Sequence, residues 1–306
     1  MNSAPWLWLV TAALVAGCSL PPASPAGLPR TDLVGPMTRT EYISPMRTPD
    51  ATTNRPEVLE RLSQSVPAVA TLNSEGNPGI SQANRALTPF GYEIRPGSGG
   101  AFDLYHGGAL VRAGFTALRP PSVSADGTDF VMAIGQVADE MWLLRPDGLH
   151  PWAYLQDMWI PPVFAGGRLV SVTSSDRRNI EVSVGGTVSF RTSVNEPVGQ
   201  LPVKKLSAWN GKWVLETVHH VIVEGEPLDY QESFGWTLIG GKPFHFIRKD
   251  DAYGFVYDGT EWLPGYTEII HNACCEGARF NPSLSETGAG FYGFRDRAWR
   301  WVTLSL

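Results

Sequence analysis

From about residue 85 to the C-terminus, short runs of β-branched and aromatic residues alternate with turn sequences. Gly, Asp-Gly or Asn-Gly interrupts the runs, as in KLSAWNGKWVLETV and YGFVYDGTEWL. This alternation is typical of β-strands joined by hairpins. The pattern therefore predicts an all-β domain over residues 85–306.

Units of strand and turn recur along this domain. They begin near Pro121, Pro162, Leu206, Leu238 and Pro282, a spacing of about 30 to 45 residues that suits one propeller blade. Such a unit is a small sheet that cannot bury both faces alone, so neighbours in a ring supply the missing contacts. We predict a β-propeller of about five or six blades, with a β-sandwich as the alternative because short strands and turns also fit two packed sheets.

One unit resembles a known repeat. SADGTDFVMAI at residues 124–134 and MWLLRPDG at residues 141–148 are similar to a blade of the TolB and WD40-like propellers. In those blades an SPDG-type turn precedes one strand and an NADG-type turn ends another. The later units depart from this pattern, with AWNGKW and VYDGTEW instead. The resemblance covers one unit and implies the propeller architecture.

The segments before residue 85 have other patterns. Residues 57–84 follow Pro56, and the sequence Pro56-Glu-Val-Leu-Glu-Arg-Leu predicts a short helix, with a loop through Asn84. Residues 18–56 are rich in proline and poor in large apolar residues, so they bury too little surface to offset the entropy of ordering. We predict that this linker is an unstructured tether, about 35 Å long as a flexible coil.

Residues 1–17 have the pattern of a signal peptide. The stretch from Trp6 to Gly17 is apolar and uncharged, and about a dozen residues at roughly 1.5 Å each cannot cross a bilayer core of about 30 Å. It therefore predicts the apolar region of a signal peptide.

The end of this stretch, Val15-Ala16-Gly17-Cys18, resembles the lipobox of bacterial lipoproteins. The resemblance implies cleavage before Cys18, a diacylglyceryl thioether on Cys18, and attachment to the extracytoplasmic side of a membrane in the cell envelope. Ser19 follows the cysteine, which in a Gram-negative host favours the outer membrane by the same resemblance.

The charge of the chain bears on its partners. The net charge is −6 and the pI is about 5.5, and the sequence contains no cluster of Lys or Arg. Nucleic-acid backbones are bound by such clusters. We therefore expect no nucleic-acid partner.

The common catalytic motifs are absent from the sequence. It contains no G-x-S-x-G elbow and no H-E-x-x-H helix, and Gly241-Lys242 is followed by Pro243 rather than by the Ser or Thr of a Walker A loop. Residues 288–293, GAGFYG, match G-x-G-x-x-G but lie between predicted strands, so we predict a hairpin. We expect no cofactor, and a protein that is not an enzyme.

Cys274 and Cys275 are adjacent and are flanked by His271, Asn272 and Glu276. Three interpretations are open, and the first is a vicinal disulfide, because thiols exported to an oxidising compartment tend to pair. A metal site is the second, although His271 and the two cysteines supply three ligands at most. Two buried thiols are the third.

The remaining histidines have less specific surroundings. His219 and His220 lie in VLETVHHVIV, where strand alternation would direct them to opposite faces and prevent them from sharing a ligand. His245, in PFHFI, is expected to pack against its aromatic neighbours.

Several carboxylates lie where predicted strands meet loops. A pair of them about 5 to 10 Å apart would suit glycoside hydrolysis. The candidates are Asp129, Glu140, Asp157, Glu216 and Asp258. Asp126 and Asp258 each precede a glycine, so turn formation is their expected role.

The domain is rich in tryptophan, and we expect most of these side chains to pack between blades. They are Trp142, Trp152, Trp159, Trp209, Trp213, Trp236, Trp262, Trp299 and Trp301. In WRWV, Trp299 and Trp301 share one strand face, which predicts core packing. Exposed side chains near Trp152 and Trp159 would be able to stack on sugars.

These observations favour a non-catalytic propeller, tethered through lipid on Cys18, that binds a protein or an envelope glycan through loops at one end of the ring. One alternative is a glycan-cleaving enzyme with two acidic residues facing the central channel. Another is a purely structural envelope protein.

Overall fold

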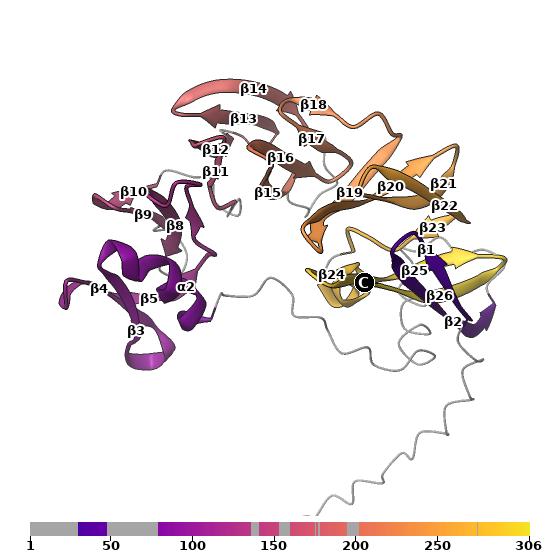
Figure 1. Ribbon diagram of the computed structural model, residues 1–306, viewed down its shortest axis with the longest axis horizontal. Helices are drawn as coiled ribbons and strands as arrows, with labels where there is room; N and C mark the ends of the chain where they lie inside the picture. Colours follow the sequence, from indigo (N-terminus) through magenta and orange to yellow (C-terminus); the bar gives the residue numbers. More distant parts are fainter. Residues whose placement is uncertain are drawn as a thin grey trace, which may run out of the picture.

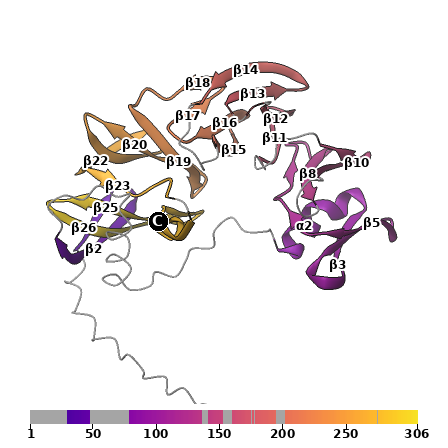
Figure 2. The ribbon, with the colours of Figure 1, turned by 180° about the vertical axis from the view of Figure 1, so that it is seen from behind.

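The computed structural model describes residues 30–47, 79–135, 141–152, 160–174, 176, 178–194, 202–273 and 275–306. Within these ranges the strands form six antiparallel sheets. The sheets follow one another in chain order along an arc, as Figures 1 and 2 show from opposite sides.

The first sheet contains three strands preceded by a short helix. Its elements are α2 (Ile80–Leu87), η1 (Thr88–Phe90), β3 (Tyr92–Pro96), η2 (Ser98–Gly100), β4 (Phe102–His106) and β5 (Ala109–Phe115). In the second sheet, β6 (Ala117–Leu118) and β7 (Ser122–Val123) both pair with β8 (Phe130–Gly135), followed by β9 (Met141–Arg145) and β10 (Gly148–Pro151).

The next three sheets have four strands each, paired in chain order. The third is β11 (Val163–Ala165), β12 (Arg168–Ser174), β13 (Asn179–Val184) and β14 (Thr187–Ser193). The fourth is β15 (Val203–Trp209), β16 (Lys212–Thr217), β17 (Val221–Val223) and β18 (Glu226–Pro227). The fifth is β19 (Glu232–Ile239), β20 (Lys242–Lys249), β21 (Ala252–Tyr257) and β22 (Thr260–Tyr266).

The sixth sheet combines strands from both ends of the chain. It contains β23 (Glu268–Ile269), β24 (Ser283–Ser285), β25 (Gly288–Arg295) and β26 (Ala298–Ser305), with η3 (Cys275–Phe280) between β23 and β24. The N-terminal strands β1 (Arg30–Val34) and β2 (Met37–Arg47) complete it, in the order β1-β2-β26-β25-β23.

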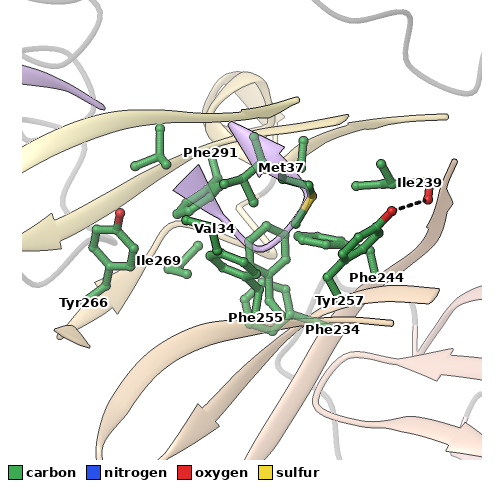
Figure 3. Packing of buried hydrophobic residues seen from close by; sticks show 14 residues of the cluster. Val34, Met37, Phe234, Ile239, Phe244, Phe255, Tyr257, Tyr266, Ile269 and Phe291 are labelled. Carbon is green, nitrogen blue, oxygen red and sulfur yellow. Dashed lines mark hydrogen bonds between the residues drawn. The ribbon is translucent and has the colours of Figure 1, made fainter. Parts of the chain in front are cut away.

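The hydrophobic cores lie between successive sheets. One core joins phenylalanines of the fifth sheet, among them Phe234 and Phe255, to Phe291 and Val302 of the sixth, as Figure 3 shows for part of this cluster. Another joins Val182 of the third sheet to Leu215 of the fourth. Each sheet therefore depends on a neighbour to bury its apolar side chains.

Strands of successive sheets contact one another along the inner side of the arc, among them β7 with β11, β11 with β15, and β19 with β24. Small antiparallel sheets that follow one another in this way and share cores form a β-propeller. The prediction of an all-β propeller is confirmed, and six sheets agree with the predicted number of blades. The sandwich alternative does not apply.

The tight turns occur where the sequence predicts them. Asn210 and Gly211 join β15 to β16 with φ angles of 47° and 74°, the left-handed values that an Asn-Gly hairpin requires. A Cβ on Gly166, in the β11–β12 turn, would lie 2.9 Å from the carbonyl oxygen of Gly211. Neighbouring hairpins of the third and fourth sheets therefore meet backbone to backbone.

The prediction of an unstructured tether through Pro56 is wrong for residues 30–47, which form β1 and β2. Pro36 lies in the turn between the two strands, and Pro45 lies within a register irregularity between Ile43 and Arg47. Prolines are tolerated at both kinds of position. The segment is ordered because β26 offers a strand edge and the fifth and sixth sheets bury Val34 and Met37.

A buried carboxylate on β2 forms ion pairs with the C-terminal strands β25 and β26. Glu41 is 1% exposed and accepts hydrogen bonds from the Tyr266 hydroxyl, from Nη2 of Arg295 at 3.0 Å and from Nη1 of Arg300 at 3.3 Å. Nη1 of Arg39 lies 3.7 Å from the same carboxylate. Buried charges are tolerated when they are paired in this way.

The loop that was predicted to extend through Asn84 contains helix α2 instead, and the predicted domain boundary at residue 85 divides this helix. Ala83 and Leu87 are buried against the first sheet. The Asn84 side-chain amide donates to the carbonyl of Ile94 at 2.8 Å and accepts from its N–H at 2.7 Å. The amide thus makes the two backbone hydrogen bonds to Ile94 that a neighbouring strand would otherwise make to β3.

The predicted signal peptide (residues 1–17), Cys18 and the predicted helix after Pro56 lie outside the described residues. Of the helices that are described, none is both long and apolar enough to cross a membrane.

Candidate functional site

The innermost strand of the sixth sheet is interrupted. Ile269 pairs with Gly293 of β25, and Ser283 pairs with Gly290 of the same strand. The chain between them, residues 271–282, leaves the sheet and returns to the same strand edge. We call this segment the excursion, and it contains the sequence that drew attention to Cys274 and Cys275.

The excursion covers the face of the sixth sheet that points away from the fifth. Phe280 packs there with Tyr292, Trp299 and Trp301, and Ala273 lies against the same cluster. The alternate residues Phe291 and Val302 belong to the core shared with the fifth sheet. Both faces of the sixth sheet are therefore buried, and the excursion supplies part of the second cover.

His271 connects the excursion to the fifth sheet. Its Nε2 lies 2.8 Å from Oε1 of Glu232, the first residue of β19, and its Nδ1 lies 2.7 Å from the carbonyl oxygen of Ile269. The ring stacks on Phe234 with centroids 3.9 Å apart and planes at 10°. The imidazole is held on its edge by two acceptors and on its face by an aromatic ring.

Glu232 is surrounded by donors. Besides His271, the Tyr253 hydroxyl donates to its Oε2 at 2.9 Å, and Nδ1 of His219 lies 3.5 Å from its Oε1. Burial raises the pKa of the Glu232 carboxyl, but the hydrogen bond and charge of His271, with the contacts to Tyr253 and His219, outweigh burial and lower it to about 2. Glu232 is thus ionised at neutral pH. Burial, together with the charge of Glu232, raises the pKa of Tyr253.

Both partners of the His271 ring nitrogens are oxygen atoms that accept hydrogen bonds. A neutral imidazole has one donor and one acceptor, whereas a carbonyl oxygen and an ionised carboxylate only accept. Both contacts of His271 are hydrogen bonds only when the ring carries two protons. The side chains of His271 and Glu232 are 14% and 12% exposed, so the pair is largely shielded from water.

The excursion also reaches the fourth sheet. Nδ2 of Asn272 donates to the carbonyl oxygen of Val218 at 3.0 Å, and Asn272 has a φ of 57°. At the other side of the excursion, the Asn281 side chain bonds the N–H and carbonyl of Ala273, each at 2.9 Å. Three successive sheets therefore determine where the tip of the excursion lies.

The prediction that His219 and His220 alternate on a strand is wrong, because both lie in the connection between β16 and β17. His219 is about half exposed beside Glu232. Burial, followed by the charge of His219, lowers the pKa of His220. The two histidines are neighbours of one carboxylate rather than members of opposite sheet faces.

The packing predicted for His245 is confirmed. It is 6% exposed, and its ring stacks on Trp236 with centroids 5.6 Å apart and lies 6.2 Å from the ring of Tyr230. Neither ring nitrogen has a hydrogen-bond partner within the described part of the chain. Burial lowers the pKa of His245 to about 4, so the ring is neutral at pH 7.

The three candidate carboxylates that the structure describes, Asp129, Glu216 and Asp258, lie in different sheets. Asp129 accepts from the N–H of Phe130 and from Arg145 in the second sheet. Glu216 accepts from the N–H groups of Gly235 and Trp236, at 2.7 and 3.0 Å, and so holds an irregularity of β19. Glu140 and Asp157 lie outside the described residues.

The turn roles predicted for Asp126 and Asp258 are confirmed. Asp126 accepts from the Ser124 hydroxyl at 2.6 Å and from the N–H of Thr128 at 3.1 Å. Asp258 lies in the β21–β22 turn with a φ of 50°, and its carboxylate pairs with Lys242 at the start of β20.

The predicted core role of Trp299 and Trp301 is also confirmed, at 0% and 6% exposure. Residues 288–293, predicted as a hairpin between strands, are instead part of strand β25 itself, which pairs with β24 and β26. A Cβ on Gly290 would lie 2.6 Å from the ring of Trp301, so this glycine makes room for an aromatic side chain. Trp152 has a backbone hydrogen bond to Met141, and Trp159 lies outside the described residues.

Cys274 lies outside the described residues, and Cys275 begins η3. The disulfide, metal and buried-thiol interpretations therefore remain predictions. Within the described ranges, no three His, Cys, Asp or Glu side chains are grouped to hold a metal ion. The sequence drew attention to His271 but not to Glu232, because the two residues are far apart along the chain and no motif links them.

No family model and no curated protein sequence matches the chain. Among solved structures, the C-terminal WD40 domain of Sif2 is 11% identical with a TM-score of 0.36, covering 84% of this chain and 72% of that one. A chain from the structure of BBS1N in complex with ARL6DN is 9% identical with a TM-score of 0.30, covering 69% and 73%. The fold assignment rests on the sheets themselves.

Proposed function

We propose that the protein is an extracytoplasmic lipoprotein whose propeller binds a protein or an envelope glycan without chemical conversion. The position of the excursion is the observation that supports this proposal. It is a segment of the inner strand that three sheets hold in a defined position beside the connections β16–β17 and β18–β19. Loops fixed in advance on a rigid scaffold bind with a lower entropic cost.

The binding surface that we propose is the end of the ring at which the excursion tip lies, and we call it the loop end. His219 supplies an exposed imidazole there. Tyr230 lies on the β18–β19 connection, and its hydroxyl donates to Glu261 at 2.9 Å. Aromatic and polar side chains of this kind serve protein and sugar recognition alike.

The tether that we propose is shorter than the sequence pattern predicts. Because β1 begins at Arg30, only residues 19–29 separate Cys18 from the sixth sheet. Fully extended, this segment spans about 40 Å, and as a flexible coil it spans about 20 Å. Lipid on Cys18 would therefore hold the outer edge of the sixth sheet near the membrane.

One experiment tests both parts of the proposal. The full chain is produced in a bacterial host with a photo-crosslinking residue at position 219, and the control carries it at Lys212, an exposed residue beside the β15–β16 turn at the opposite end of the sheet. We expect a lipidated mass on Cys18, and a crosslinked envelope protein or glycan at position 219 but not at position 212.

The Cys18→Ala variant provides the second comparison. It should leave the membrane fraction while keeping its crosslinking to a purified partner. A chain whose mass at Cys18 is unmodified would contradict the lipid anchor. Equal crosslinking at positions 219 and 212 would contradict binding at the loop end.

A further inference from the structure

Two leucine side chains on the outer strands of the fifth and sixth sheets are exposed. Leu33 of β1 is 77% exposed, the largest fraction among the large apolar side chains that the structure describes, and Leu263 of β22 is 44% exposed. β1 and β22 are the outermost strands of their sheets, and both lie at the same end of the arc (Figure 1). The described part of the chain therefore leaves both side chains open to an external partner.

The two strands meet at the turn between β1 and β2. A Cβ on Gly35 in this turn would lie 3.2 Å from Cζ2 of Trp262, so the backbone of the turn packs directly on the indole ring. Trp262 also packs against the core that the two sheets share, and Leu263 follows it on β22. Leu33, Trp262 and Leu263 thus lie along one outer edge of the molecule, which we call the apolar rim.

We propose that the apolar rim is a contact surface for the lipid bilayer, with the side chains of Leu33 and Leu263 at the boundary between headgroups and acyl chains. This inference rests on the proposed function, because the lipid on Cys18 is what brings the rim to the membrane. It adds a second contact with the same membrane, made by the folded domain itself.

The length of chain before β1 favours lipid as the occupant of the rim. Residues 19–29 separate Cys18 from Arg30, the first residue of β1, and Leu33 follows on the same strand. Even when it is fully extended, this segment keeps β1 within about 40 Å of the lipid. A short tether gives an effective concentration on the order of millimolar. A contact through two leucines that is too weak for a free protein therefore forms on a tethered one.

Two carboxylates on these strands are already neutralised. On β1, Asp32 pairs with Arg39 of β2, whose Nε donates to its Oδ1 at 2.8 Å. On β22, Glu261 pairs with Lys249 of β20, whose Nζ donates to its Oε2 at 2.8 Å. Unpaired negative charges would be repelled by the anionic lipids of a membrane surface. Because both carboxylates are paired, they do not oppose the contact of the rim with lipid.

Quenching by brominated lipids tests the contact. The full chain is produced with a fluorescent amino acid at position 33, extracted from the membrane fraction and reconstituted into phosphatidylethanolamine and phosphatidylglycerol vesicles with brominated acyl chains. The control carries the label at Val188, which is 36% exposed on β14, the outer strand of the third sheet. We expect about twofold quenching at position 33, as for a side chain at the headgroup–acyl boundary, and no quenching at position 188.

A substitution tests whether the two leucines act together. With the label at position 263, Leu33→Thr should reduce the quenching, because threonine keeps the strand propensity and removes apolar surface. The matched change Val188→Thr on β14 should leave the quenching at position 263 as it is in the wild type. Equal quenching in the two variants would contradict a contribution of Leu33 to the lipid contact.

The lipid contact and the lipid anchor are tested separately by a second preparation. Labelled chains with a histidine tag in place of residues 1–18 are held on the same vesicles by a nickel-chelating lipid. Quenching at position 33 in this preparation supports the contact even when the native chain carries no lipid on Cys18, a result that contradicts only the proposed anchor. A label at position 33 that brominated lipids quench in neither preparation overturns the contact. If that label is also shielded from aqueous iodide, a protein or a second copy of the chain covers the rim instead.

Discussion

Two buried carboxylates, one in the sixth sheet and one in the fifth, have different cationic partners. Glu41 of β2 faces Arg295 and Arg300 of the sixth sheet, and Glu232 of β19 faces His271 of the excursion. Tyrosine hydroxyls complete both sites, from Tyr266 and Tyr253 respectively. Arginine stays charged at any pH that a protein meets, whereas histidine does not.

The two sites therefore differ in the kind of cationic side chain beside the carboxylate and in the segments that they join. The Glu41 network joins strands from the two ends of the chain, and no change of pH near neutrality discharges its arginines. The Glu232 site joins a loop to a sheet through a histidine. The comparison shows that similar buried carboxylates are neutralised by arginines in one site and contacted by a histidine in the other.

The largest effect is expected at Glu41. The change Glu41→Gln leaves Arg295 and Arg300 without their buried counter-charge, and breaking a buried pair in this way costs about 3 to 5 kcal/mol. The free energy of unfolding from urea denaturation measures it. The control Glu93→Gln removes an exposed pair with Arg95 and should leave the transition unchanged. A similarly small effect at Glu41 would show that its network does not stabilise the pairing of the N-terminal and C-terminal strands.

The next-largest effect is expected at His245, a buried histidine whose ring has no carboxylate partner in the described part of the chain. The pKa of His245 is about 4 in the folded protein and about 6.5 in an unfolded chain. The unfolded state therefore binds more protons between these values, and stability is complete above pH 6.5 and falls toward pH 4, by about 3 kcal/mol at most.

The variant His245→Phe should lose this part of the acid sensitivity. Denaturation midpoints measured from pH 7 to pH 4 for both chains check it, with His150→Gln as a control that removes an exposed histidine. If the midpoints of the wild type and of His245→Phe depend on pH in the same way, the ring of His245 has a hydrogen-bond partner in solution and does not add to the acid sensitivity.

The smallest effect concerns the tyrosines. Tyr253→Phe removes one donor from Glu232 and should cost about 1 to 3 kcal/mol, the range for a hydrogen bond to a charged group and its desolvation. Tyr266→Phe removes the equivalent donor from Glu41, which keeps its arginines. We expect the larger loss of unfolding free energy in Tyr253→Phe, because Glu41 keeps hydrogen bonds from Arg295 and Arg300. Urea denaturation of the two variants measures it, and equal losses would remove the distinction between the sites.

Part of the site was predictable from sequence and part was not. The neighbourhood of Cys274 and Cys275 drew attention to His271, because unusual residues lie together there. Glu232 begins a strand in a different sheet, and no local pattern relates the two residues. His219 and His220 were assigned to a strand by their apolar neighbours, but the chain turns there, with the Thr217 hydroxyl accepting from the N–H of His220 at 3.1 Å.

By itself the sequence determined the all-β class, the hairpin turns and the repeated units, because turn residues and the two-residue period of strands act within a few positions. Only the tertiary structure decided that residues 30–47 are strands, that the inner strand of the sixth sheet is interrupted, and that Glu232 meets His271. Each of these depends on an edge or a partner supplied by a distant segment. A strand edge such as that of β26 orders a proline-containing segment that has too little apolar surface to order itself.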